Sequence, residues 1–319
     1  MLSNERLPTI IDVGEHRPEL AGWIRSNRGW LESELASAGA LVLKGANVAT
    51  PEAFESAVSA ISTEIYTQNG EHVAFNATGT VQTPVFYPPE SKILWHNENS
   101  FHHSWPARLF FSCISPSAEG GETPLVDSRL VYRRLSRSVR EAFEQRGVRY
   151  VRNYVQGFGL TYEKTLNVMG REEAETFCQS NFMDYLWRDD ILCTSAARPA
   201  TIEHPKTGET SFIAQGLHWH QACLPADIRE SMREFYGEDL MPRDFLFGDG
   251  GRIEDAIIDE LLAIYGELEY ARPWEAGEIV VIDNMITAHA RNPYVGKRLM
   301  LVALADPVKF RDSDNQQRA

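Results

Sequence analysis

Three histidines, one acid and two asparagines gather in one short run, WHNENSFHH at residues 95–103. Side chains two residues apart on an extended segment point to the same face, so His96 and Glu98 present an imidazole and a carboxylate side by side. Two ligands cannot hold an ion firmly, and His289, which follows a strongly apolar run, is the candidate for the third. Two histidines and one carboxylate on one face of an ion leave three positions open, which suits Fe(II) sites that bind both a cosubstrate and O₂. On spacing alone, a surface histidine beside a glutamate remains the simpler interpretation.

The composition limits the classes of partner. The chain has 319 residues, 43% of them hydrophobic, and its 45 Asp and Glu against 31 Lys and Arg give a formal charge of −14. This acidity argues against nucleic acid or an anionic membrane as the partner, because both require a basic face. Four cysteines form no CxxC pair, and the chain contains neither a signal-peptide pattern nor an apolar run long enough for a membrane helix. We therefore expect a cytoplasmic globular protein.

Helical and strand patterns alternate along the chain without a clear linker. Strands are predicted at 40–45, 93–98, 108–114, 123–127, 148–154, 278–284 and 299–306. Helices are predicted at 18–39, 51–66, 128–147, 162–179, 226–237 and 252–267. Strands in both halves with helices inserted between them favour one α+β domain built on an antiparallel sheet pair.

Several longer runs resemble a known family. They are GALVLKGANVATPEAFESAV, YPPESKILWHNENSF, WPARLFFSCISPSAEGGETPLVDSR, YVRNY and GEIVVIDNMITAHARNPYVGKR, which cover most of residues 39–306 in the expected order. In these runs the sequence resembles the taurine/2,4-D dioxygenase-like (TauD/TfdA) family of Fe(II)/2-oxoglutarate-dependent oxygenases. It looks most similar to the syringomycin-type branch, which hydroxylates amino acids in peptide natural-product pathways.

The resemblance implies a fold and a domain layout. The implied core is a double-stranded β-helix (jelly-roll, cupin-like) with flanking and inserted helices, in a single domain spanning 1–319. Within it we expect a helix and strand extension at 1–70, a jelly-roll core at 93–306, and helical inserts near 162–179 and 226–267. The polar tail at 310–319 completes the chain.

The resemblance also assigns roles to residues. It implies that His96, Glu98 and His289 hold Fe(II), and that Thr123 and Arg298 bind the cosubstrate 2-oxoglutarate, with O₂ as the second cosubstrate. A guanidinium suits the distal carboxylate because it is planar, always charged and able to donate two parallel hydrogen bonds. Many relatives have Asp where this chain has Glu98. Halogenating relatives have a small residue there, so the carboxylate excludes that variant.

The substrate anchor is less well defined. Sulfonate-oxidising relatives carry a second arginine four residues beyond the cosubstrate arginine, where this chain has Val302. Arg152, on a flanking strand, is one candidate for contacts with an amino-acid substrate, and Arg108, also on a flanking strand, could equally form a structural ion pair. The other candidates for substrate contacts are Asn97, Gln215, His218, His220 and Arg291.

The function implied is hydroxylation of an unactivated C–H bond, at the β carbon of an amino acid, with release of succinate and CO₂. The amino acid is free or tethered to a peptidyl carrier protein. Three alternatives remain: another small molecule, a desaturation or cyclisation outcome, or a non-catalytic jelly-roll that binds a metal or ligand. A zinc hydrolase would leave Thr123 and Arg298 unexplained.

Overall fold

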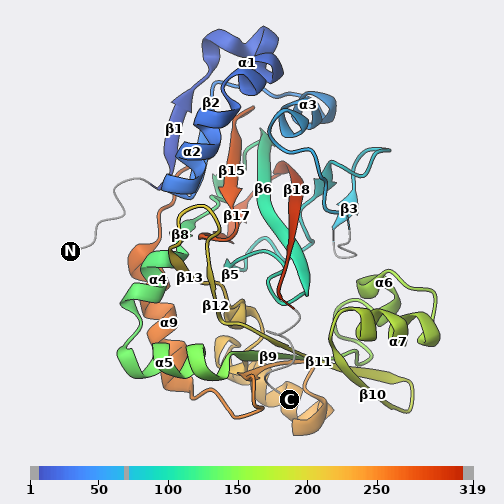
Figure 1. The fold of residues 1–319 in the computed structure, drawn as a ribbon. Helices are drawn as coiled ribbons and strands as arrows, with labels where there is room; N and C mark the ends of the chain where they lie inside the picture. The colour runs from blue at the N-terminus through green and yellow to red at the C-terminus, as the bar shows by residue number, and fades with distance from the viewer. Residues whose placement is uncertain (1–6, 68–71, 312–319) are drawn as a thin grey trace.

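A computed structural model describes residues 7–67 and 72–311 of the chain (Figure 1). Most of the predicted tail, 312–319, and parts of the predicted N-terminal extension, 1–6 and 68–70, lie outside the described residues. The larger strands are β1 (Thr9–Asp12), β2 (Ala40–Lys44), β5 (Ile93–His96), β6 (Ser104–Ser115), β8 (Leu125–Asp127), β9 (Val148–Asn153), β10 (Asp184–Arg188), β11 (Ile191–Arg198), β14 (Arg243–Phe247), β15 (Ile279–Asp283), β16 (Thr287–Arg291) and β18 (Leu299–Lys309). The shorter ones are β3 (Val73–Ala74), β4 (Gln82–Thr83), β7 (Glu119–Gly120), β12 (Thr201–Glu203), β13 (Thr210–Phe212) and β17 (Tyr294–Val295).

A seven-stranded sheet in the order β1-β2-β15-β6-β18-β4-β3 forms the largest layer. Its central strands are almost continuously apolar, as in IVVID of β15, because both faces of the sheet are covered. The pairs are antiparallel except for β1 with β2, which is parallel and departs from the predicted antiparallel arrangement. One face buries Leu41, Phe110 and Leu301 against the N-terminal helices.

The opposite face of this sheet covers a three-stranded sheet in the order β5-β16-β8. Leu125 of β8 belongs to the same buried cluster as Val280 and Val302 of the large sheet. Phe111 of β6 also contacts His289 of β16, with ring centroids 5.3 Å apart. The space between these two sheets is therefore where the candidate metal ligands lie.

The helices cover the edges and outer faces of the sheets. They are α1 (Leu20–Ser26), α2 (Arg28–Ala38), α3 (Pro51–Ile61), α4 (Ser128–Arg134), α5 (Arg137–Arg146), α6 (Tyr162–Leu166), α7 (Arg171–Ser180), α8 (Ala226–Tyr236) and α9 (Asp255–Leu268), with short 3-10 turns η1 (Gly14–Glu19), η2 (Gly216–His218), η3 (Gln221–Cys223) and η4 (Glu238–Leu240). α3 begins at Pro51 as predicted, and Thr50 caps it, because the Thr50 hydroxyl accepts from the Ala53 N–H. Of the helices in the described parts of the chain, none is both long and apolar enough to cross a bilayer.

A third layer, the four-stranded sheet β10-β11-β9-β14, lies beyond the three-stranded sheet (Figure 1). The predicted insert at 162–179 is the helix pair α6 and α7. The predicted insert at 226–267 is only partly helical, because β14 lies between α8 and α9 and pairs with β9. The predicted helices at 226–237 and 252–267 correspond to α8 and α9, and the strand between them was not predicted. In RDFLF the two phenylalanines lie two residues apart and are both buried, which is the period of a half-buried strand.

Arg198 links the four-stranded sheet to the segment that carries His96 and Glu98. The guanidinium is fully buried and donates to the backbone carbonyls of Phe101, Asn181, Ala197 and Phe182. Burial lowers the pKa of Arg198 to about 10, so the group stays charged at neutral pH. Charge-assisted bonds to several carbonyls offset part of the cost of burying it.

Replacing Arg198 with Met should therefore destabilise the protein strongly, because several buried carbonyls lose their donor at once. We expect a loss of about 2–4 kcal/mol in the free energy of unfolding, measured by urea denaturation. The control is Arg137→Met, whose side chain is 84% exposed in an i,i+4 pair with Glu141. That variant should change stability by less than about 0.5 kcal/mol. Equal effects in the two variants would contradict the role given to Arg198.

Candidate active site

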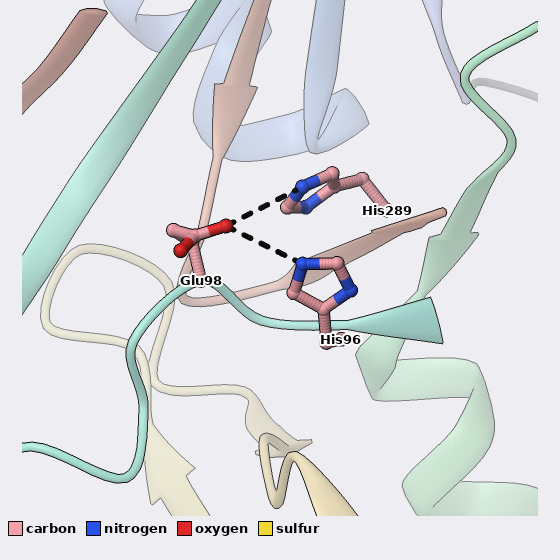
Figure 2. A group of neighbouring side chains, drawn as sticks. All are labelled: His96, Glu98 and His289. Atoms are coloured by element: carbon pink, nitrogen blue, oxygen red, sulfur yellow. Dashed lines mark ion pairs between the residues drawn. The ribbon is translucent and has the colours of Figure 1, made fainter. Parts of the chain in front are cut away.

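The structure brings His96, Glu98 and His289 together, although 191 residues separate the second and third in the sequence (289 − 98). His96 ends β5, Glu98 follows two residues later, and His289 stands in the middle of β16, directly opposite His96 in the antiparallel ladder. The Nε2 atoms of His96 and His289 lie 3.3 Å and 3.7 Å from Glu98 Oε2 (Figure 2). One ligand atom from each residue fits within a 4.8 Å cluster.

This geometry fits a shared metal ion. Two donors each about 2.1 Å from one ion and at right angles to each other lie about 3 Å apart, so spacings of 3.3 Å and 3.7 Å need only small adjustments. Two imidazoles and one carboxylate are the donor set of non-haem Fe(II) oxygenases. The assignment of these three residues as iron ligands stays a prediction that the geometry supports.

Asn284 holds the Glu98 backbone in place. Its side-chain oxygen accepts from the Glu98 N–H at 2.7 Å, and its amide donates to the Glu98 carbonyl at 2.9 Å. The same amide donates to the Pro106 carbonyl on β6. The turn ends at Asn99, whose φ of +57° is a left-handed conformation that asparagine tolerates. Asn97 lies between His96 and Glu98, and its side chain points away from theirs and donates to the Asn284 carbonyl.

A backbone carbonyl fixes the tautomer of His96. The Leu94 carbonyl accepts from His96 Nδ1 at 2.8 Å, which leaves the Nε2 lone pair directed toward Glu98. The same oxygen accepts from His218 Nε2 at 2.7 Å, and the two rings meet edge to face at 4.6 Å. His218 therefore packs against the candidate ligand His96 and helps to hold it in place. The pKa of His218 falls to about 3 because burial and the charge of His96 both oppose its protonation.

The protonation states suit ligand roles. Burial would raise the pKa of Glu98, but hydrogen bonds from His72 and His96 hold it well below its usual range. Burial, followed by the charge of His96, lowers the pKa of His289 well below its usual value. The site therefore combines an ionised carboxylate with a neutral imidazole, which are the forms that bind metals.

His72 is a site residue that the sequence analysis did not identify. Its Nε2 lies 3.8 Å from Glu98 Oε1, and its Nδ1 contacts the Thr83 carbonyl at 3.0 Å. It lies 24 residues before His96 in a loop-rich stretch (96 − 72). No local pattern in the sequence signals this approach, because it depends on how the loop folds back over the site.

The predicted cosubstrate residues flank the same strands. Thr123 precedes β8, whose Leu125 stands opposite His289, and its hydroxyl accepts from Trp274 Nε1. Arg298 precedes β18, and its Nε is buried and has no hydrogen-bond partner among the described residues. Burial lowers the pKa of Arg298, and the side chain packs over Gly121. Gly120 and Gly121 both have positive φ, and a Cβ on Gly120 would lie 2.2 Å from the Pro293 carbonyl oxygen, so this position requires glycine.

The predicted substrate contacts divide into two groups. Asn97, Arg108 and Arg291 are engaged elsewhere: Arg108 pairs with Asp306, and Arg291 donates to the carbonyls of residues 87, 88 and 91. For Arg108 the structural ion pair is thus the alternative that the fold adopts.

Apart from Arg152, which lies on β9, the other predicted contacts lie on one segment that follows β13. HWH at 218–220 is not a strand: η2 and η3 turn the chain there, and His220 donates to the Ile253 carbonyl. Gln215 keeps a buried amide oxygen with no partner among the described residues. Only His218 of this segment reaches a candidate ligand.

Comparison with known proteins decides the family. Residues 13–304 match the family described as taurine catabolism dioxygenase TauD, TfdA family. The chain belongs to this family. It is therefore an Fe(II)- and 2-oxoglutarate-dependent dioxygenase, and Fe(II), 2-oxoglutarate and O₂ are its cofactor and cosubstrates.

Relatives of this TauD-family chain come from several organisms. The dapdiamide synthesis protein DdaC of Enterobacter agglomerans is 31% identical over 280 residues, which cover 87% of this chain and 85% of DdaC. A clavaminate synthase-like protein of Arabidopsis thaliana is 27% identical over 297 residues, covering 88% and 86%.

Among solved structures, PvcB of Pseudomonas aeruginosa matches with a TM-score of 0.53 and 15% identity over 92% of this chain and 84% of PvcB. A second PvcB structure, described as an Fe, α-ketoglutarate-dependent oxygenase from an isonitrile synthetic pathway, gives the same TM-score at 14% identity, covering 94% and 84%. At these identities the likeness concerns the fold.

Metal binding by the three clustered side chains can be tested without turnover. Mn(II) should raise the melting temperature by roughly 5 °C at a concentration a hundredfold above Kd. Glu98→Ala and His289→Ala should abolish that shift, because each removes a donor. His16→Ala, on the distant turn η1, should retain it. A full shift in either of the first two variants would refute the assignment.

The support that His218 gives to His96 predicts a separate effect. His218→Phe keeps an aromatic ring but loses the N–H that donates to the Leu94 carbonyl. Loss of such an outer contact typically weakens metal affinity by about 10–100-fold, and Mn(II) titration should show at least the lower value. His220→Phe is the matched control, because His220 bonds to Ile253 and not to the ligands. Unchanged affinity in His218→Phe would remove the positioning role.

Proposed function

We propose that this enzyme hydroxylates an unactivated C–H bond, at the β carbon of an amino acid, in natural-product biosynthesis, releasing succinate and CO₂. The substrate amino acid is free or tethered to a peptidyl carrier protein. The observation that carries the proposal is the cluster of two imidazoles and one carboxylate between two sheets, with the half-buried Arg298 directly before β18 of the large sheet.

The relatives support the setting of the reaction. The name of DdaC assigns it to dapdiamide synthesis, and that of PvcB assigns it to an isonitrile synthetic pathway. Both are small-molecule biosynthetic pathways. The proposal extends that setting to this chain, together with the syringomycin-type branch that its sequence resembles.

The proposed fold is a jelly-roll formed by the seven-stranded and three-stranded sheets, in a single domain. Supporting it, the two sheets bury one shared apolar cluster, and strands from both halves of the chain alternate within them. A cytoplasmic location is supported by the four cysteines, which are all free thiols.

Each proposed role follows from the chemistry of the side chain. His96, Glu98 and His289 would hold Fe(II) on one face, and the metal with 2-oxoglutarate supplies the oxidising chemistry when bound. Arg298 would pair with the distal carboxylate of the keto acid, and Thr123 would donate a hydroxyl hydrogen bond to it. Phe111, packed on His289, and the buried strand β15 would keep water from the oxidising centre.

Anaerobic spectroscopy and product analysis test this function together. The wild-type protein with Fe(II) and 2-oxoglutarate should give a weak visible charge-transfer band, and should release succinate in air with an amino-acid substrate.

Arg298→Met should raise the KM for 2-oxoglutarate at least about tenfold, because a buried carboxylate loses its charge partner. Lys297→Met, at the exposed neighbouring position, should not. A wild-type protein without the band would refute the proposed function.

A further inference from the structure

Trp274 lies beside Thr123, the proposed contact of 2-oxoglutarate. It belongs to the segment between α9 and β15, and its indole Nε1 donates to the Thr123 hydroxyl at 3.2 Å. The two residues are 151 positions apart, so this bond joins distant parts of the chain. An indole nitrogen can only donate, whereas a hydroxyl has one hydrogen to donate and two lone pairs that accept. The bond therefore occupies one lone pair of Thr123 and leaves its hydrogen for another partner.

The segment that carries Trp274 is held at both ends. At its beginning, Tyr270 exchanges two backbone hydrogen bonds with Leu125 of β8, at 2.8 Å and 2.9 Å. At its end, Glu278 is 1% exposed, and its carboxylate accepts from the Arg272 guanidinium at 2.7 Å and 2.8 Å. Charge-assisted hydrogen bonds of this length hold a buried carboxylate firmly. The position of the indole is therefore set by contacts on both sides of it.

The same contacts connect this segment to the candidate ligands. Leu125 stands directly opposite His289 in the pair of β8 with β16, and Thr123 lies two residues before Leu125. Trp274 packs against the buried cluster that contains Leu125 and Phe111, and the Phe111 ring contacts His289. The indole N–H can act on the site through Thr123, because the Thr123 hydroxyl is the group to which it donates.

The space between Trp274 and Thr123 is too small for a keto acid. A cavity of about 20 Å³ lies there, and Thr123, Trp274, Tyr270, Arg272 and Glu278 are among the residues that line it. Such a volume holds about one water molecule, so a keto acid in contact with Thr123 lies on the other side of the hydroxyl. Among the described residues, this hydroxyl accepts the bond from Trp274 and donates none. Its hydrogen is thus available to an acceptor on that other side.

We infer that Trp274 is a positioning residue for the keto acid, because its N–H orients the Thr123 hydroxyl so that the hydroxyl hydrogen points to 2-oxoglutarate. The inference rests on the proposed function, in which Thr123 donates to the cosubstrate, and adds a residue that acts through Thr123. Without the indole N–H, the hydroxyl can rotate and is ordered only when the keto acid binds. A donor that is ordered beforehand loses less freedom on binding, so the affinity is higher.

The test measures the affinity for 2-oxoglutarate by anaerobic titration of the Fe(II)–2-oxoglutarate charge-transfer band. Trp274→Phe keeps an aromatic ring in the apolar cluster but loses the N–H. It should weaken the affinity about three- to tenfold, as expected for one neutral hydrogen bond, and leave Mn(II) affinity within about twofold because no candidate ligand changes. The matched control is Trp187→Phe on β10, which loses an indole bond to Glu175. It should leave both affinities within about twofold.

A double-mutant cycle separates positioning from packing. Thr123→Val removes the hydroxyl and should itself weaken 2-oxoglutarate binding. In that background, Trp274→Phe should weaken binding by less than about a further twofold, because the hydroxyl on which the indole acts is gone. Trp274→His keeps a ring N–H and should bind 2-oxoglutarate more tightly than Trp274→Phe. Circular dichroism verifies folding, and the cycle is run with Trp274→His if Trp274→Phe does not fold.

Three results would overturn the inference: unchanged affinity in the Trp274 variant, unchanged affinity in Thr123→Val, or an effect at Trp274 of the same size with and without the Thr123 hydroxyl. Each of these results leaves the wild-type band with 2-oxoglutarate intact. Failure of the proposed function removes that band, so the two failures are distinguishable.

Discussion

The pairing of β5 with β16 is the contact on which the site depends, because it sets His96 directly opposite His289. Glu98 lies on the same segment as His96, so only this strand pairing brings His289 to the other two candidate ligands. A shift of one residue in the register would turn one imidazole to the other face of the sheet. The register is irregular beyond His289, where a bulge separates it from the next paired residue. Asn284 secures the arrangement by bonding both Glu98 and the Pro106 carbonyl of β6, which ties the ligand turn to the large sheet.

This arrangement brings polar groups together in a buried space. Glu98 is ionised there because His72 and His96 outweigh its burial, while burial keeps His289 and His218 neutral. A carboxylate in a low-dielectric site attracts a cation strongly. The same burial acts on Arg298, whose Nε has no partner among the described residues, so an anion bound there would gain from the low dielectric too. The ligand cluster thus favours a cation, and Arg298 favours an acid.

Much of this was predictable from the sequence. His96 and Glu98 share a strand face by simple alternation, and the seven predicted strands all have counterparts among the observed ones, because their apolar runs are long. The strand that carries His289 was not predicted, since TAHAR has no strong strand pattern. β14, which lies between two predicted helices, was not predicted either, and His72 was not identified as a site residue. These features were not predicted for one reason. Each position is determined by contacts with distant segments, and the local periodicity of the sequence carries no information about such contacts.

The packing of the large sheet explains why the pattern of sulfonate-oxidising relatives does not locate the substrate contacts of this chain. Val302 lies fully buried in the apolar cluster of the large sheet, opposite Phe111, where sulfonate-oxidising relatives carry an arginine. A guanidinium at that point would have to displace this packing, so the apolar core and a charged substrate contact exclude each other at this position. The two-sheet core therefore carries the residues assigned to metal and keto acid, and at Val302 it keeps an apolar side chain for packing.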